Sequence, residues 1–110
     1  MGQIHSDVER IVDCLVEALS KRIRVERVIL FGSRARGDAT ELSDVDLLVV
    51  SSDFGHDILA DYALLYRSLP VLDVDVDMIP YTPTKLASAE RDTFLETVLE
   101  DGVTVYPRAS

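Results

Sequence analysis

Apolar residues recur along the chain with two different periods, which predict helices and strands in alternation. After Ser6, apolar residues follow at helical spacing, and Ser6 with Glu9 matches the Ser/Thr-x-x-Glu pattern of a capping box. Runs of β-branched and aromatic residues that stop at Gly32 or at a Ser-Ser-Asp turn are typical of short buried strands. The predicted helices cover residues 6–22, 58–69 and 83–101, and the predicted strands cover residues 27–31, 45–50, 71–79 and 103–106.

This order of elements predicts a single-domain α/β fold in which helices flank a mixed sheet of about four strands. A length of 110 residues fits one domain, residues 1–110, and a hydrophobic content of 47% is ordinary for a globular protein. Cys14 is the only cysteine, which excludes an internal disulfide and a cysteine-based zinc cluster. No apolar run approaches the ~20 residues of a membrane span, and the first residues lack a signal-peptide pattern. We therefore expect a cytoplasmic protein that does not enter membranes.

Charge is distributed unevenly along the chain. The net charge of −9 repels phosphates, so direct binding of nucleic acid is not expected. Six of the eleven Lys and Arg residues lie within residues 21–36, whereas residues 38–77 hold ten acidic residues and a single base, Arg67. This clustering is typical of a solvated surface, but a cationic rim beside an anionic pocket would also produce it. Charge alone favours the solvated surface.

A glycine-rich segment, Gly-Ser-Arg-Ala-Arg-Gly at residues 32–37, directly follows the first predicted strand. Glycine at such a junction lets backbone N–H groups approach an anion closely, so the segment could hold a phosphate. A P-loop is excluded, because Asp38-Ala39 stands where Lys-Ser/Thr is required. The alternative is an ordinary tight turn.

Two groups of acidic residues lie on the second and third predicted strands. Asp44 and Asp46 open the second strand and point to the same face, since side chains two residues apart on a strand share a face. Apolar residues follow at once, so these carboxylates stand where a buried strand emerges and where a cation would offset their charge. Asp73, Asp75 and Asp77 form a second row of carboxylates. A solvated turn and a solvated edge strand are the alternatives.

The combination resembles a known signature. Gly32-Ser33, followed ten residues later by Asp44-Val45-Asp46 and then by a strand acid, resembles the polymerase-beta-type nucleotidyltransferases. More narrowly, FGSRARGDATELSDVDLLVV is similar to the minimal nucleotidyltransferase (MNT) domains that are partners of HEPN-domain proteins. The resemblance extends from about residue 26 to residue 106.

The resemblance implies a role for individual residues. The implied catalytic and metal-binding carboxylates are Asp44, Asp46 and Asp77, with Asp75 as the alternative third acid. The implied nucleotide-binding residues are Gly32, Ser33 and Arg36. For Arg34, a structural role and a role facing a partner both stay open.

The resemblance also implies an activity. The expected enzyme uses Mg²⁺ in a two-metal site, or Mn²⁺, and transfers AMP from ATP to a hydroxyl of a HEPN-type helical partner protein, as the antitoxin of a toxin–antitoxin pair. An acceptor-binding surface is expected from another chain, since 110 residues leave little room for one. The alternatives are transfer to a small acceptor such as an antibiotic, with a separate subunit completing the pocket, and a non-catalytic module that blocks its partner. Acceptor, base preference and oligomeric state, including a homo-oligomer, stay open.

Histidine, cysteine and two of the tyrosines have ordinary explanations. His5 and His56 lack partners at ligand spacing, so we expect them to be solvated. Cys14 is expected to pack within the first helix, and Tyr62 and Tyr66 are expected in the core or at an interface.

Overall fold

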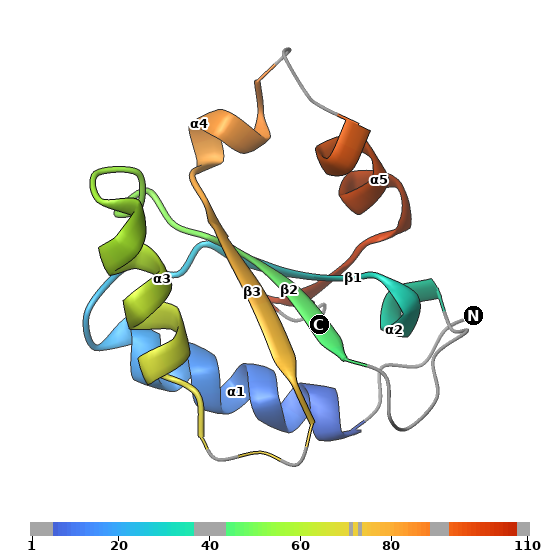
Figure 1. The fold of residues 1–110 in the computed structure, drawn as a ribbon, viewed down its shortest axis with the longest axis horizontal. Coiled ribbons are helices and arrows are strands. Elements are labelled where there is room, and N and C mark those ends of the chain that lie inside the picture. The colour runs from blue at the N-terminus through green and yellow to red at the C-terminus, as the bar shows by residue number, and fades with distance from the viewer. Residues whose placement is uncertain (1–5, 37–43, 71, 73, 89–92, 108–110) are drawn as a thin grey trace.

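The computed structural model describes residues 6–36, 44–70, 72, 74–88 and 93–107, and Figure 1 shows their arrangement. In chain order the elements are α1 (Ser6–Ser20), β1 (Arg27–Phe31), α2 (Ser33–Arg36), β2 (Val45–Val50), α3 (Ile58–Arg67), β3 (Val76–Tyr81), α4 (Pro83–Leu86), α5 (Thr93–Asp101) and β4 (Val103–Tyr106). The predicted first, second and last strands are confirmed with their bounds.

The strands form one mixed sheet in the order β3-β2-β1-β4. β1 pairs antiparallel with both β2 and β4, whereas β2 and β3 are parallel. The parallel pair needs a crossover connection, and α3 supplies it between the end of β2 and the start of β3. The predicted α/β fold, with a four-stranded mixed sheet flanked by helices, is confirmed.

The two faces of the sheet carry different helices (Figure 1). Because side chains alternate along a strand, Leu47 and Val49 of β2 join the core beneath α1 and α3, whereas Leu48 and Val50 join a second core with α5. The buried strand β2 is apolar on both faces after its second residue, as expected for a central strand. Its one polar position, Asp46, lies at the end where the strand begins.

The third strand differs from its predicted bounds. It begins at Val76 rather than at residue 71 and extends through Pro80 to Tyr81; Asp73 lies outside the described residues. The backbone N–H of Met78 donates to the Tyr66 hydroxyl at 3.0 Å, so this edge of β3 faces α3 and not a strand. Pro80 is two residues further on and faces the same edge, where its missing N–H removes no ladder hydrogen bond. A proline is therefore accommodated inside the strand.

The predicted third helix is wrong as a single element. Thr82 caps α4, its Oγ1 accepting from the Lys85 N–H at 3.1 Å, and Pro83 occupies the first turn as expected. This helix ends at Leu86, and α5 begins only at Thr93. Ala87 and Ser88, which follow α4, are not helical and have small side chains that anchor little to the core; residues 89–92 lie outside the described residues.

Three smaller expectations can be compared with the structure. His56 is exposed as predicted, and His5 lies outside the described residues. Cys14, expected to pack, is exposed, because the buried stripe of α1 passes beside it; that stripe consists of Val8, Ile11, Val12, Leu15 and Leu19. None of the described helices is both long and apolar enough to cross a membrane.

Candidate active site

The pairing of three strands brings two carboxylates together at one end of the sheet. Asp46 on β2 lies opposite Phe31, the last residue of β1, and opposite Asp77 on β3. Partners on adjacent strands lie ~5 Å apart, so the side chains of Asp46 and Asp77 are neighbours on one face. Alternation places both on the face that carries α5, where Leu48 and Ile79 continue the same rows. The sequence could propose these acids, but only the β2–β3 pairing places them side by side.

Asp44 and Asp75 flank this pair. Asp44 is exposed and precedes β2, and its negative charge acts on Asp46. Asp75 is exposed and precedes β3, and its backbone carbonyl accepts from the Val45 N–H at 2.9 Å. Asp77, not Asp75, is the strand partner of Asp46. Between the two candidates for the third acid, the register favours Asp77.

Gly32 closes the site at the end of β1. Its φ of +76° lies in the left-handed region that favours glycine. A Cβ atom there would overlap Asp46 Oδ2 and would lie 3.3 Å from its Cγ. The backbone therefore lies directly against the Asp46 carboxylate, an approach that a larger residue would prevent. Both the turn and this contact require glycine.

A short helix, α2, follows this glycine and carries the remaining predicted residues. The Gly32 carbonyl accepts from the N–H groups of Ala35 at 3.1 Å and Arg36 at 3.2 Å, which closes the turn. Ser33 is the first residue of α2, and the exposed Arg36 is its last. The positive charge of Arg36 acts on Asp46. The segment that follows, residues 37–43, lies outside the described residues.

The electrostatics of the site centre on Asp46. Partial burial raises the pKa of Asp46 above its ordinary value, the negative charges of Asp77 and Asp44 raise it further, and Arg36 opposes them. Like charges close together favour protonation unless a cation offsets them. Three carboxylates and one guanidinium thus share one electrostatic environment, which spacing along the sequence alone could not establish.

Arg34 has a role that sequence reasoning left open. Its side chain is only 4% exposed, and its Nη1 lies 3.2 Å from Oδ2 of Asp7, in the first turn of α1. This ion pair joins α2, which carries the site loop, to the helix that packs beneath the sheet. The two residues are 27 positions apart, so no local pattern predicted the pair. Among the alternatives for Arg34, the structure supports the structural one.

Two aromatic side chains border the candidate site on the face of the sheet that carries α5. The rings of Phe31 and Phe94 meet edge to face, with centroids 5.6 Å apart and an interplanar angle of 87°. Phe31 directly precedes Gly32, so this contact connects the end of β1 to α5. Phe94 remains 41% exposed and borders the side of the sheet from which the carboxylates project.

The donor chemistry suits a hard divalent cation, since carboxylate oxygens are the ligands that Mg²⁺ prefers. The mutual repulsion that raises the pKa of Asp46 is the charge imbalance that such a cation would relieve. Within the described ranges, no three acidic, His or Cys side chains stand close enough together to hold a metal ion in this conformation. Side-chain rotation would be needed for Asp44, Asp46 and Asp77 to converge on one ion.

Comparison with known proteins identifies the family. The model of the nucleotidyltransferase domain matches residues 12–102, which include Gly32, Asp46 and Asp77. The chain belongs to the nucleotidyltransferase family. The site at the end of β1 and the start of β2 is thus the candidate active site of a nucleotidyltransferase.

Two curated relatives of this nucleotidyltransferase come from Methanocaldococcus jannaschii, and both carry the name putative protein adenylyltransferase. The first is 35% identical over 101 residues, which cover 89% of this chain and 97% of the relative. The second is 32% identical over 75 residues, covering 67% of this chain and 75% of the relative. The family match makes this chain an enzyme of the nucleotidyltransferase type.

Two solved structures resemble the fold of this nucleotidyltransferase. A putative nucleotidyltransferase from Sulfolobus solfataricus superimposes with a TM-score of 0.59 at 26% identity, covering 94% of this chain and 89% of that chain. A chain of a toxin–antitoxin complex with AMP-PNP superimposes with a TM-score of 0.61 at 28% identity, covering 89% of this chain and 72% of that chain. Both superpositions support a nucleotidyltransferase fold for this chain.

Proposed function

We propose that this nucleotidyltransferase transfers AMP from ATP to a hydroxyl of a partner protein and depends on a divalent metal ion. We further propose that the partner is a HEPN-type helical toxin and that this chain is its antitoxin. The observation that carries the first proposal is the register of β2 and β3, which sets Asp46 against Asp77 beside the backbone of Gly32. The names of the curated relatives and the toxin–antitoxin complex with AMP-PNP support the choice of acceptor and donor.

In this proposal the acceptor oxygen attacks the α-phosphorus of ATP. The bond from the α-phosphorus to the bridging oxygen breaks, and pyrophosphate leaves. Asp77, exposed on the edge strand, accepts the proton of the acceptor hydroxyl. Its exposed side chain can be reached by an acceptor from another chain, whereas Asp46 is enclosed between β1 and β3.

Other residues of the site bind and orient the triphosphate. Gly32 provides a backbone surface without a side chain next to Asp46, so a phosphate can approach the main chain. Ser33 can donate a hydroxyl hydrogen bond, and Arg36 supplies a positive charge from the end of α2. Asp44, Asp46 and Asp77 would hold Mg²⁺, which when bound neutralises phosphate charge and polarises the phosphorus–oxygen bonds. Catalysis here rests on positioning and on charge neutralisation.

The test compares Asp46→Asn and Asp77→Asn with wild type in a transfer assay. The purified chain is incubated with Mg²⁺, ATP labelled at the α-phosphate and the protein encoded beside it, and the mass of that protein is measured. We expect wild type to add AMP to the partner and Asp46→Asn and Asp77→Asn to lose at least ~100-fold in rate. Glu100→Gln is the matched control, because it removes a carboxylate that is exposed on α5.

Asp75→Asn decides which acid is the third one. If Asp75→Asn loses transfer while Asp77→Asn keeps it, the role given to Asp77 is wrong. Full transfer by Asp46→Asn would overturn the proposed site. If the partner is silenced without added mass, and Gly32→Val silences it equally well, the chain acts as a blocking module. Transfer of AMP to a small acceptor, but not to the partner protein, would favour the antibiotic-type alternative.

A further inference from the structure

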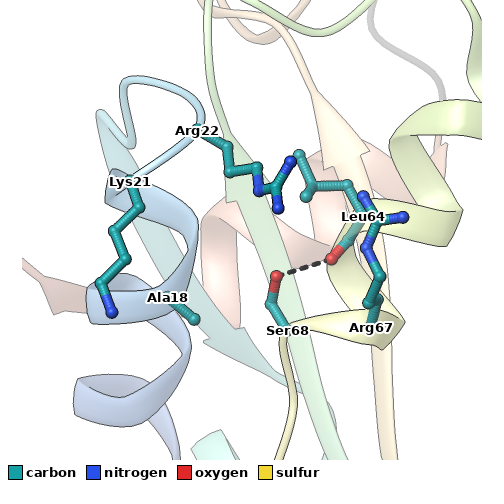
Figure 2. Close-up of a pocket in the computed structure, with 6 residues that line it drawn as sticks. All are labelled: Ala18, Lys21, Arg22, Leu64, Arg67 and Ser68. Atoms are coloured by element: carbon teal, nitrogen blue, oxygen red, sulfur yellow. Dashed lines mark hydrogen bonds between the residues drawn. The ribbon is translucent and has the colours of Figure 1, made fainter.

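A cationic cleft lies between the C-terminal ends of α1 and α3, on the face of the sheet opposite α5 and apart from the candidate active site. Its volume is about 480 Å³, within the range of small-ligand sites. The described residues that line it are Ala18, Lys21, Arg22, Leu64, Arg67 and Ser68 (Figure 2). None of these residues belongs to the site around Asp46. We name this feature the α1/α3 cleft.

The charge of this cleft is opposite to that of the protein. The whole chain has a net charge of −9, yet the described lining of the cleft contains three cationic side chains and no carboxylate. Lys21 and Arg22 come from the end of α1, and Arg67 comes from the end of α3, across the cleft. In Figure 2 the side chains of Arg22 and Arg67 both extend toward the middle of the cleft. Because both guanidinium groups are exposed, water and salt screen much of their repulsion, and a bound anion would reduce it further.

All three cationic side chains, Lys21, Arg22 and Arg67, are exposed to solvent. Within the described ranges, Lys21, Arg22 and Arg67 have no side-chain hydrogen bond or ion pair, in contrast to Arg34 with Asp7. Their side chains also make no hydrogen bond to the carbonyls at the C-terminal ends of the described helices α1 and α3. The Leu19 carbonyl near the end of α1 accepts from the N–H groups of residues 22 and 23 at 2.8 and 2.9 Å, so backbone donors satisfy this carbonyl.

The end of α3 is satisfied in the same way. The Ser68 N–H donates to the carbonyls of Leu64 at 3.1 Å and Leu65 at 3.2 Å, and the Ser68 hydroxyl donates to Leu64 at 2.7 Å. The guanidinium of Arg67 is therefore not needed at these carbonyls. Since the one hydroxyl proton of Ser68 is used, the remaining side-chain donors of the lining belong to Arg22 and Arg67, which extend toward the middle of the cleft, and to Lys21 at its border.

We propose that the α1/α3 cleft binds the phosphate group of a small phosphorylated ligand. A carboxylate has two oxygens and one charge, which a single guanidinium can fully engage. Two guanidinium groups and one ammonium offer more donors and charge than that, whereas a phosphomonoester dianion has three terminal oxygens and two charges. Ala18 and Leu64 provide apolar surface beside the cations, and the volume exceeds that of a phosphate alone. The ligand is thus a phosphate carried on a small organic group.

The experiment is calorimetric titration of the purified chain with AMP, adenosine and tetraglutamate, in a chelator that removes divalent metal from the candidate active site. We expect AMP to bind, adenosine to fail, and Arg22→Ala and Arg67→Ala each to weaken AMP binding at least ~5-fold. Arg24→Ala is the matched control, because it removes an exposed cation of the same segment that does not line the cleft. It should leave the affinity within ~2-fold of wild type.

Other outcomes overturn the proposal. If Arg24→Ala weakened AMP binding as much as Arg22→Ala and Arg67→Ala, the attraction would come from the overall positive charge of this segment and not from the cleft. Tighter binding of tetraglutamate than of AMP would make the cleft a docking site for an acidic protein segment. Loss of AMP binding in Gly32→Val but not in Arg67→Ala would place the ligand in the candidate active site. The binding test is independent of the proposed transfer reaction, because the titrations contain neither divalent metal nor an acceptor protein. Failure of one proposal therefore leaves the other standing.

Discussion

Replacing Asp7 by Ala should destabilise the protein more than replacing Arg34 by Met, although each change breaks the same ion pair. The Arg34 side chain is 4% exposed and the Asp7 side chain is 50% exposed. Arg34→Met leaves behind a carboxylate that water solvates, and methionine fills much of the buried volume. Asp7→Ala leaves a buried guanidinium without this counter-charge, which costs more.

The magnitude follows from the geometry. Two unit charges 3.2 Å apart attract by about 5 kcal/mol at an effective dielectric of 20, before desolvation and side-chain ordering are subtracted. Exposed pairs retain about 0.2–1 kcal/mol, and breaking a buried pair costs about 3–5 kcal/mol. Since Asp7 is half exposed, we expect Asp7→Ala to cost about 1–2 kcal/mol and Arg34→Met less than about 1 kcal/mol. In a chain of this size, each kcal/mol lowers the melting temperature by about 4 °C.

The assay is a double-mutant cycle by chemical denaturation with Asp7→Ala, Arg34→Met and the combined variant. Asp7 also lies in the first turn of α1, where a negative charge favours the helix dipole. The cycle separates that contribution from the ion pair, because Asp7→Ala loses the dipole interaction both in wild type and in the Arg34→Met background. A coupling energy above about 0.5 kcal/mol is expected for Asp7 with Arg34. Additive effects of the two substitutions would refute the role of the pair.

Three further predictions concern the site and the sheet edge. Gly32→Ala should lower the free energy of unfolding by about 1–3 kcal/mol and weaken ATP binding. Gly55→Ala, which is also at positive φ but away from Asp46, should lower stability without changing ATP binding. Chemical denaturation measures the first effect and ATP titration the second. Asp46→Asn should raise the melting temperature in metal-free buffer by about 1–3 °C, because it removes the repulsion between Asp46 and the neighbouring carboxylates, which solvent partly screens. An unchanged or lower melting temperature would contradict this repulsion. Tyr66→Phe should cost about 0.5–1.5 kcal/mol and speed hydrogen exchange at the Met78 amide; unchanged exchange would show that the hydroxyl does not protect this edge.

Much of the local structure followed from residue patterns alone. The spacing of apolar residues predicted α1, and β-branched runs predicted β1, β2 and β4, because these patterns depend only on the period of each element. The motif from Gly32 to Asp46 pointed to the family that the comparison found. Predictions were weaker where the pattern was ambiguous. The alternating acids suggested a strand from residue 71, whereas pairing with β2 begins only at Val76.

The candidate site depended on two levels of information. The sequence by itself determined which carboxylates, glycine and arginines are available and on which elements they lie. Only the tertiary structure decided that Asp46 faces Asp77, that Gly32 lies against Asp46, and that Arg34 turns inward to Asp7. Each of these contacts joins residues that are 14 to 31 positions apart in the sequence. Their distances are set by strand order, register and helix packing, which no local pattern of residues encodes.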